Sequence, residues 1–406
     1  MTAAPAPPPT FDLRHLDDAF YANPFPVYAA LREHAPVYRC PDGSFFLSRH
    51  DDLNSVYRNA KLFSSDKRTQ FEPVFGTDSP LYQHHTASLV FNDPPLHTHV
   101  RKAFGNALSP RMIVAMQPGV VRLVDNLLDG IEQRREFDLI GDYAAAIPVE
   151  IIGNLLRIPA EERGPLRRWS LAILGALEVR LSANQIALGN RCVEEMLEYL
   201  ADFVERRRHH LSDDDDDILA RLIRWEADGY RLSQTELYHQ CIFLLNAGHE
   251  TTSNLIGNGI QLLLTHPQEL ARLRAEPALI DSAVEEILRY ESSNQLGNRT
   301  AREDTAIRGV AIPAGSILTL CIGAANRDPQ VFSDPDRFDI ARNPNPHLAF
   351  GAGIHTCAGL NVARLEARVA IARIFERFPQ LRIAGTPRRS RRARFRGFDA
   401  LPLAIA

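Results

Sequence analysis

The stretch Phe350–Gly359 (FGAGIHTCAG) places a single cysteine, Cys357, in a glycine-bracketed loop directly before a predicted helix. Apolar residues recur at helical spacing from Leu360 to Phe378. A cysteine just before a helix lies in the field of unpaired N–H groups and of the positive dipole end, and both favour the thiolate. The glycines allow the backbone to approach something flat and bulky. A thiolate held in this way can be the axial ligand of a haem iron.

Taken alone, a single cysteine is usually a buried structural thiol or an oxidation-prone residue. Zinc is disfavoured, because no second Cys or His stands at C-x-x-C spacing. The whole stretch, however, resembles the F-G-x-G-x-H-x-C-x-G loop of the cytochrome P-450 superfamily of haem-thiolate monooxygenases, in its soluble bacterial type. The resemblance implies a haem b whose iron is bound by Cys357, with Phe350 and Gly351 beside it.

The composition is that of an ordinary globular protein, with 406 residues of which 45% are hydrophobic and 24% are charged. We see no Gly/Ser linker, repeat or change of composition in the middle of the sequence. We therefore expect a disordered proline-rich tail over residues 1–10 and a single domain over residues 11–406. The net charge of −4 is too small to indicate a nucleic-acid partner.

The sequence shows neither the apolar core of a signal peptide nor an apolar run of membrane-spanning length. The cysteines are widely scattered, which fits a reducing compartment without disulfides. We therefore expect a soluble, cytoplasmic protein without a membrane partner.

Helical periodicity marks residues 110–134, 182–208 and 233–265, while strand-like pieces lie near the N-terminus and late in the chain. The pattern predicts a mainly α fold with small β-sheets (α+β), and the resemblance implies the cytochrome P-450 fold with haem between the long central helix and the cysteine loop. We interpret the acidic run 213–217 as a solvated helix cap. We interpret the arginine-rich run 388–396 as a solvated loop and strand face. The strand-like pieces are residues 37–38, 45–47, 317–320, 381–383 and 401–403.

The long helix predicted over residues 233–265 begins with a capping box and would run roughly 50 Å at about 1.5 Å per residue. Its centre, AGHETT at residues 247–252, interrupts an apolar stretch with a glycine, a charge and two hydroxyl groups. This could be a harmless kink or a notch beside a ligand. It resembles the A-G-x-E-T oxygen-activation motif of the same superfamily. The resemblance implies that Thr251 stabilises bound dioxygen, that Glu250 relays protons, and that Ala247 and Gly248 lie against the haem.

Three further residues match a structural triad of the superfamily. Glu286 and Arg289 stand three residues apart on one helix face, which in isolation usually means a surface ion pair. Arg337, in the stretch FSDPDRF, matches the third member. The resemblance implies that this triad fixes the fold around the cysteine loop.

Haem carries two propionates, which require partners in the protein. The stretch DPPLHTHVR at residues 93–101 places His97 and Arg101 on one helix face and matches the D-P-P-x-H-x-x-x-R stretch of the superfamily. Arg299 and His355 complete the set that the resemblance implies. Arginine forms strong, geometrically specific bonds with carboxylates.

The substrate pocket is defined only by position in the superfamily. We expect Phe243, Leu244 and Phe395 to supply apolar walls, with further contacts from residues 71–90. Asn294 and Gln295 lie in a polar stretch after Arg289 and would either contact the substrate or cap the local backbone.

The predicted activity is oxygen insertion: dioxygen is activated with two external electrons, and a small organic molecule is hydroxylated, demethylated or epoxidised. We expect a ferredoxin with its NAD(P)H-dependent reductase as donor, because we recognise no flavin or iron–sulfur module, and we expect a monomer. One alternative is a peroxide-driven peroxygenase, and another is a non-catalytic haem-based sensor. The acid–threonine pair argues against both.

Overall fold

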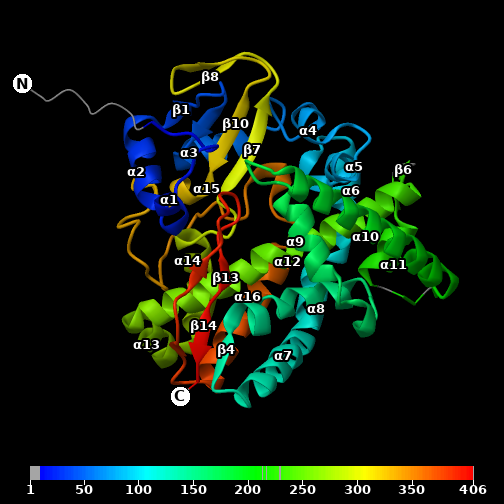
Figure 1. The fold of residues 1–406 in the computed structure, drawn as a ribbon, viewed down its shortest axis with the longest axis vertical. Coiled ribbons are helices and arrows are strands. Elements are labelled where there is room, and N and C mark those ends of the chain that lie inside the picture. Colours follow the sequence, from blue (N-terminus) through cyan, green and yellow to red (C-terminus); the bar gives the residue numbers. More distant parts are fainter. Residues whose placement is uncertain (1–9, 213, 216, 228–229, 406) are drawn as a thin grey trace, which may run out of the picture.

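A computed structural model describes residues 10–405, apart from 213, 216, 228 and 229. The predicted tail at residues 1–10 falls almost entirely outside the described residues. Figure 1 shows a strand-rich part that contains the N-terminal segments and a larger helical part crossed by one long helix, α12. The predicted fold class, mainly α with small β-sheets, is confirmed.

The largest sheet has the strand order β1-β2-β10-β7-β3. Strand β1 (Val37–Arg39) pairs antiparallel with β2 (Phe45–Leu47), and β10 (Ile317–Cys321) joins β2 in parallel. Strand β7 (Leu296–Ala301) pairs antiparallel with β10 and with β3 (Phe63–Ser64). The sheet therefore brings the N-terminal strands beside segments that lie more than 200 residues later in the chain.

The remaining strands form smaller sheets, with the strand orders β11-β14-β4, β12-β13, β5-β6 and β8-β9. The predicted strand pieces at residues 382–383 and 402–403 are confirmed there. The strands are β4 (Glu136–Asp138), β5 (Glu226–Ala227), β6 (Tyr230–Arg231), β8 (Thr305–Ile307), β9 (Val310–Ile312), β11 (Arg382–Ile383), β12 (Arg388–Arg389), β13 (Phe398–Ala400) and β14 (Pro402–Ala404).

The central helix is α12 (Gln234–Thr265), with 32 residues and the predicted capping box between Ser233 and Glu236. It contacts α8 (Ala146–Leu155), α9 (Leu166–Gly175), α10 (Ala183–His209) and α16 (Leu360–Arg377). Gly248 does not break it. A Cβ atom at Gly248 would lie 2.2 Å from Ile152 Cδ1, so the glycine allows α8 to pack closely on the middle of α12.

The predicted helices at residues 110–134 and 182–208 are confirmed with small differences at their ends. None of the helices in the described chain is long and apolar enough to cross a membrane. All the cysteines are free thiols. The other helices are α1 (Asp18–Ala22), α2 (Phe25–His34), α3 (His50–Arg58), α4 (Arg68–Phe75), α5 (Pro80–Ala87), α6 (Leu96–Ala107), α7 (Pro110–Glu132), α11 (Ile218–Arg224), α13 (Pro267–Ala275), α14 (Ile280–Tyr290) and α15 (Ile322–Ala325).

Two charged runs depart from their predicted solvation. In the acidic run, where residues 213 and 216 lie outside the described chain, Asp217 is buried; it caps α11 and pairs with Arg207 at 2.6 Å. In the basic run, Arg394 and Arg396 turn inward and bind the protein interior. The prediction of a solvated arginine face is therefore wrong for Arg394 and Arg396, because long side chains on a surface loop can reach buried carbonyl and carboxylate groups. It is correct for Arg388 and Arg391, which are exposed.

A buried ion pair holds the segment that leads to the cysteine loop. Glu286 and Arg289 on α14 are both 0% exposed, and Arg289 binds both carboxylate oxygens of Glu286, at 2.7 and 2.8 Å. The same guanidinium donates to the carbonyl oxygens of Asn326, Pro335 and Arg337. These bonds fix residues 326–337 against α14, upstream of the loop.

The second guanidinium of this cluster belongs to Arg342. Its Nε lies 3.1 Å from Glu286 Oε2, whereas Arg337 is exposed and takes part through its backbone carbonyl. The expected triad of Glu286, Arg289 and Arg337 is corrected in its last member. The sequence pattern did not reveal which of two nearby arginines turns toward α14.

Arg342→Ala should lower the free energy of unfolding by about 2–4 kcal/mol, because it leaves the buried Glu286 carboxylate less well paired. Arg337→Ala should change it by less than about 0.5 kcal/mol, because that side chain is exposed. Urea unfolding followed by circular dichroism measures both. Equal losses in the two variants would contradict the assignment of Arg342.

Candidate active site

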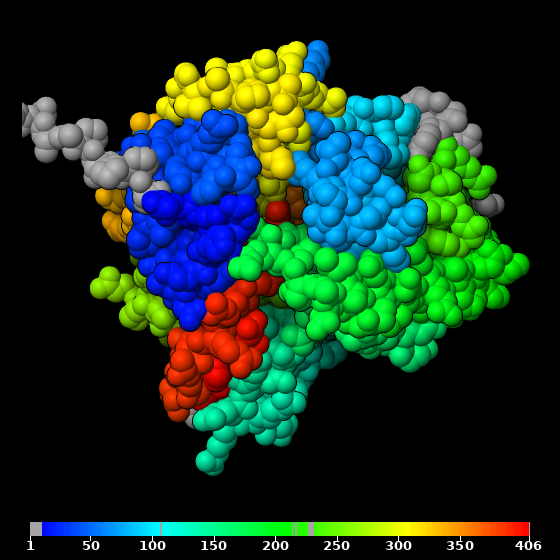
Figure 2. Space-filling model, turned by 45° about the horizontal axis from the view of Figure 1, so that its top comes forward, coloured from blue at the N-terminus to red at the C-terminus, as the bar shows by residue number. Residues whose placement is uncertain are grey.

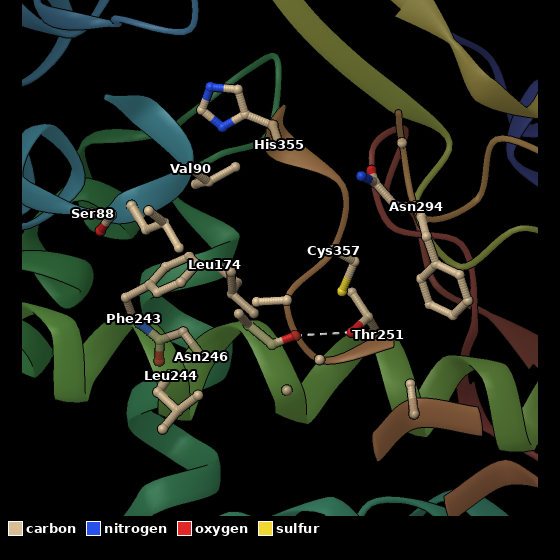
Figure 3. Close-up of a pocket in the computed structure, with 18 of the residues that line it drawn as sticks. Ser88, Val90, Leu174, Phe243, Leu244, Asn246, Thr251, Asn294, His355 and Cys357 are labelled. Carbon is tan, nitrogen blue, oxygen red and sulfur yellow. Dashed lines mark hydrogen bonds between the residues drawn. The ribbon is translucent and has the colours of Figure 1, made fainter. Parts of the chain in front are cut away.

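One large cavity, with a volume of about 360 Å³, lies between α12, the cysteine loop and the main sheet. Figure 2 shows a hollow at the centre of one face, beside the light-blue segment that contains α4 and α5. Cys357 from the loop and Thr251 from α12 both line the cavity, and they lie close together at the centre of Figure 3. The two motifs that the sequence singled out therefore meet in one site.

The cysteine loop is held by its own backbone. The N–H of Cys357 donates to the carbonyl of Phe350 at 2.9 Å. Gly353 has φ +72°, and a Cβ atom there would lie 2.4 Å from the carbonyl oxygen of Tyr57 on α3. Glycine is therefore required at this position both by the backbone conformation and by the contact with α3.

The predicted thiolate is not favoured in the protein alone. Burial raises the pKa of the Cys357 thiol, while the N–H of Gly359 and the cations Arg101 and Arg364 lower it less strongly. The helix-start field that the sequence indicated is present but is outweighed by desolvation. A bound metal cation would supply the missing positive charge, since a coordinating thiol is deprotonated.

The four residues expected to bind propionates are brought together on one side of the cavity. His97, Arg101, Arg299 and His355 all line it, and the rings of His97 and His355 lie 4.1 Å apart. Both ring nitrogens of His97 and Nε2 of His355 lack a hydrogen-bond partner within the described chain.

Lys67 adds a further cation that sequence reasoning missed. It lines the same cavity, is 3% exposed, and its Nζ finds no hydrogen-bond partner among the described residues. Burial, reinforced by the neighbouring Arg299 and Arg394, lowers the pKa of Lys67 to about 7. A single lysine in a segment without a recognised motif gives no signal of this position.

This cation-rich wall fits a dianionic group. Glu366 is the only carboxyl group in the described wall of the cavity, and burial raises the pKa of Glu366 well above its ordinary value, which favours its neutral form. The cations therefore lack an opposing charge inside the cavity. The two propionates of haem b would supply it, and the cavity also presents a thiol for the iron. The residues present fit haem b.

Thr251 and Glu250 occupy different environments. Thr251 lines the cavity, and its Oγ1 donates to the carbonyl of Ala247 at 2.9 Å. Glu250 points away, is buried, and pairs with Arg392, which also binds Glu178 at 3.1 Å. Burial raises the pKa of Glu250, whereas Arg392 opposes that change. Both Ala247 and Gly248 line the cavity as expected.

The expected substrate residues divide into two groups. Phe243, Leu244, Asn294 and Phe395 line the cavity. Gln295 is not among its lining residues; its Nε2 donates to the carbonyl of Ser292 at 2.6 Å. Of the two roles left open for Gln295, the structure fits backbone capping and not a cavity contact, because successive residues of an extended segment point in opposite directions and Asn294 faces the cavity.

The cavity wall also contains polar residues that the sequence did not single out. His84, His85 and Ser88 lie within the segment 71–90, which was expected to contribute contacts, but no individual residue of it was identified. Asn246 and Arg394 were not expected in the wall. The one signal for Asn246 was an amide within an apolar stretch of the predicted central helix.

Known proteins match this chain over most of its length. A family model described as Cytochrome P450 matches residues 179–391. The biotin biosynthesis cytochrome P450 of Bacillus subtilis (strain 168) is 35% identical over 389 residues, which cover 95% of this chain and 96% of that protein. The vitamin D(3) 25-hydroxylase of Pseudonocardia autotrophica is 40% identical over 369 residues, which cover 90% of this chain and 89% of that protein.

Solved structures agree with the fold. The crystal structure of P450BioI in complex with an acyl carrier protein carrying hexadec-9Z-enoic acid has a TM-score of 0.90 and 33% identity, covering 96% of this chain and 100% of that chain. CYP109E1 from Bacillus megaterium in complex with testosterone has a TM-score of 0.87 and 29% identity, covering 96% of this chain and 100% of that chain.

Cys357→Ser should abolish the thiolate-specific Soret band of the reduced carbon-monoxide complex, because serine cannot supply a sulfur ligand. Cys321→Ser, at a buried cysteine outside the cavity wall, is the control and should retain the band. Absorbance of the haem-loaded proteins measures both. Persistence of the band in Cys357→Ser would refute the assignment.

Lys67→Met should speed the transfer of haem to apomyoglobin by about tenfold or more, because a charge-assisted hydrogen bond is worth about 1.5–3 kcal/mol. The exposed Lys61 gives a matched control, and Lys61→Met should release haem at the wild-type rate. Equal rates for the wild type and Lys67→Met would show that Lys67 does not bind the haem.

Proposed function

Since the chain belongs to the cytochrome P450 family and is a haem-thiolate monooxygenase, we propose that Cys357 is its iron ligand and that its substrate is a mainly apolar molecule. The carrying observation is that Cys357 and Thr251, from segments more than 100 residues apart, line one cavity whose wall is largely apolar. When bound, haem b supplies the iron at which dioxygen is activated with two electrons and one oxygen atom is inserted into the substrate.

The cations of the cavity orient the haem. We assign the propionates to His97, Arg101, Arg299 and His355, with Lys67 as an additional partner. Arg299 is held in place by its Nη1 bond to the carbonyl of Asn298, at 2.7 Å, and by the ring of Tyr57. A held guanidinium loses less freedom when it binds a carboxylate, and this favours one haem orientation.

Thr251 and Glu250 handle protons on different sides of α12, Thr251 inside the cavity and Glu250 outside its wall. The Thr251 hydroxyl is placed to donate a hydrogen bond into the cavity after releasing the carbonyl of Ala247. Glu250 is linked through Arg392 to Glu178, and these last two residues line a second cavity of about 240 Å³. We propose that protons reach Glu250 from this second cavity. The raised pKa of Glu250 helps it to hold a proton before transfer.

The substrate is bounded by apolar side chains and by one amide near the reacting centre. Phe243, Leu244 and Phe395 form walls, and Asn294 Oδ1 has no hydrogen-bond partner in the described part of the chain. A substrate group that donates to this oxygen would remove the cost of leaving it unpaired, about 1–3 kcal/mol. One relative is named as a vitamin D(3) 25-hydroxylase and another as a biotin biosynthesis cytochrome P450. These names are compatible with a mainly apolar ligand.

The proposed electron source is an external ferredoxin with its NAD(P)H-dependent reductase. We also propose that the enzyme is cytoplasmic and monomeric. Two arginines of α16, Arg364 and Arg368, could form a basic docking patch for the ferredoxin, but both are paired with carboxylates. Arg364 forms two bonds with Glu285, both at 2.7 Å, and Arg368 pairs with Asp281 at 3.1 Å. These carboxylates offset the charge that would attract an acidic partner. We therefore expect only a modest effect of ionic strength on electron transfer.

Thr251→Ala should lower the amount of product formed per NAD(P)H consumed by about tenfold, because the cavity loses the Thr251 hydroxyl donor. Hydrogen peroxide should be formed instead of the missing product. Thr251→Ser keeps the hydroxyl and should remain coupled. The measurement combines product, peroxide and NAD(P)H assays, with ¹⁸O₂ to show one labelled oxygen atom in the product. Full coupling in Thr251→Ala would exclude this role for Thr251, and unlabelled product from the wild type would refute the monooxygenase reaction.

A further inference from the structure

One end of the main cavity is formed by polar side chains that the reaction does not use. His84 and His85 on α5 and Asn246 on α12 all line the cavity and are 2%, 2% and 3% exposed. Figure 3 shows Asn246 and Ser88 on one side of the site and Asn294 on the other, with Cys357 and Thr251 between them. This polar end of the cavity is therefore separate from the side of the cavity that contains Asn294.

His84 and Asn246 contact each other but leave two atoms unpaired. His84 Nε2 lies 3.4 Å from Asn246 Nδ2, which is a long hydrogen bond. Because the amide nitrogen can only donate, Nε2 is the acceptor and Nδ1 carries the proton. His84 Nδ1 and Asn246 Oδ1 then have no partner anywhere in the described chain. One donor and one acceptor thus remain buried at the same end of the cavity.

Contacts from neighbouring helices hold this end in place. Gln240 Nε2 on α12 donates to the carbonyl of Ala87 at 2.7 Å, which ties the end of α5 to α12. At the start of α5, the N–H of Leu81 donates to Asn190 Oδ1 at 3.0 Å, and Gly189 lets Leu81 pack closely on α10. Such anchored groups lose little freedom when they bind a ligand.

The imidazoles at this end are neutral. Burial lowers the pKa of His84 well below its ordinary value, and the adjacent His85 and His239 lower it further. Burial also lowers the pKa of His85 to about 3 and that of His239 to about 4. A charged ligand group placed here would be buried without a counter-charge, which is strongly unfavourable. The complementary group is therefore polar and uncharged.

We propose that His84 and Asn246 bind an uncharged hydroxyl group of the substrate at the end of the cavity remote from Thr251. A hydroxyl can accept from His84 Nδ1 and donate to Asn246 Oδ1, so it satisfies both unpaired atoms, whereas a ketone can satisfy only the donor. This inference rests on the proposed function, because it names a feature of the same enzyme's substrate.

The helix sets the spacing between this hydroxyl and the reacting carbon. Asn246 and Thr251 are five positions apart on α12, a rise of roughly 7.5 Å at about 1.5 Å per residue. Apolar side chains, including Leu174, Phe243 and Leu244, line the cavity. The substrate class is thus an apolar body with a hydroxyl at one end and the oxidised carbon at the other.

The test uses three probes of one shape: cyclododecanol, cyclododecanone and cyclododecane. Their dissociation constants are measured from the spin-state shift of the haem-loaded wild type and of the double variant His84→Phe/Asn246→Leu. In the variant, the preference for the alcohol over the hydrocarbon should fall by at least about tenfold. The preference for the ketone over the hydrocarbon should fall by a smaller factor. The proposal would be overturned if the double variant kept the wild-type preference. It would also be overturned if none of the probes shifted the haem spin state of the wild type.

Asn294→Leu removes an amide from the opposite side of the cavity. The preference for the alcohol should fall less in this variant than in the double variant, and a larger fall would place the hydroxyl at Asn294 and overturn the proposal. Gln261→Leu, which removes an amide of α12 outside the cavity wall, is the matched control and should keep the wild-type preference within about twofold. Thermal unfolding provides a second readout. The double variant should unfold at or above the wild-type temperature, because it removes two unpaired buried atoms, whereas a purely structural role for the two residues would lower that temperature.

The proposed function can fail separately from this inference. A wild type that lacks the thiolate-specific carbon-monoxide band or forms no oxygenated product would refute the proposed function. A wild type that oxidises all three probes, with the same order of affinities in the double variant, would refute only the hydroxyl subsite.

Discussion

The site depends on one buried ion pair, Glu286 with Arg289. Neither charge is exposed, and the pair extends its hydrogen bonds to carbonyl groups between residues 326 and 337 and to the guanidinium of Arg342. Removing one partner from such a pair leaves an uncompensated buried charge, so the cluster acts as a unit. It fixes the segment that leads to the cysteine loop, and the loop's glycines then set the position of Cys357 against α3 and α12.

The cavity next to this loop has two chemically different ends. Lys67, Arg101 and Arg299 create a cationic wall that suits the propionates of haem b. The wall formed by α5 and α12 is apolar except for neutral imidazole, amide and hydroxyl groups. The cationic wall orients a charged cofactor, and the uncharged end favours a neutral substrate. One cavity can therefore bind both ligands without competition between their polar groups.

Sequence patterns predicted the features that depend on local structure. The cysteine loop, the capping box and length of α12, and the approach of Thr251 to the site follow from motifs within single segments. The missed or corrected features depend on contacts between distant segments. Arg342 rather than Arg337 reaches Glu286, and Lys67 joins the cavity wall only when the chain brings it together with residues such as Arg299. Gln295 turns away because Asn294 faces the cavity, and His84 meets Asn246 only after α5 packs on α12.

The central claim is that the chain binds haem iron through the sulfur of Cys357. X-ray absorption at the iron edge of the haem-loaded protein tests it most directly, because it reports the atoms bonded to iron. The account predicts one sulfur atom beside the porphyrin nitrogens in the wild type, and its replacement by a lighter atom in Cys357→Ser. A wild-type spectrum that contains only nitrogen or oxygen neighbours would contradict the account.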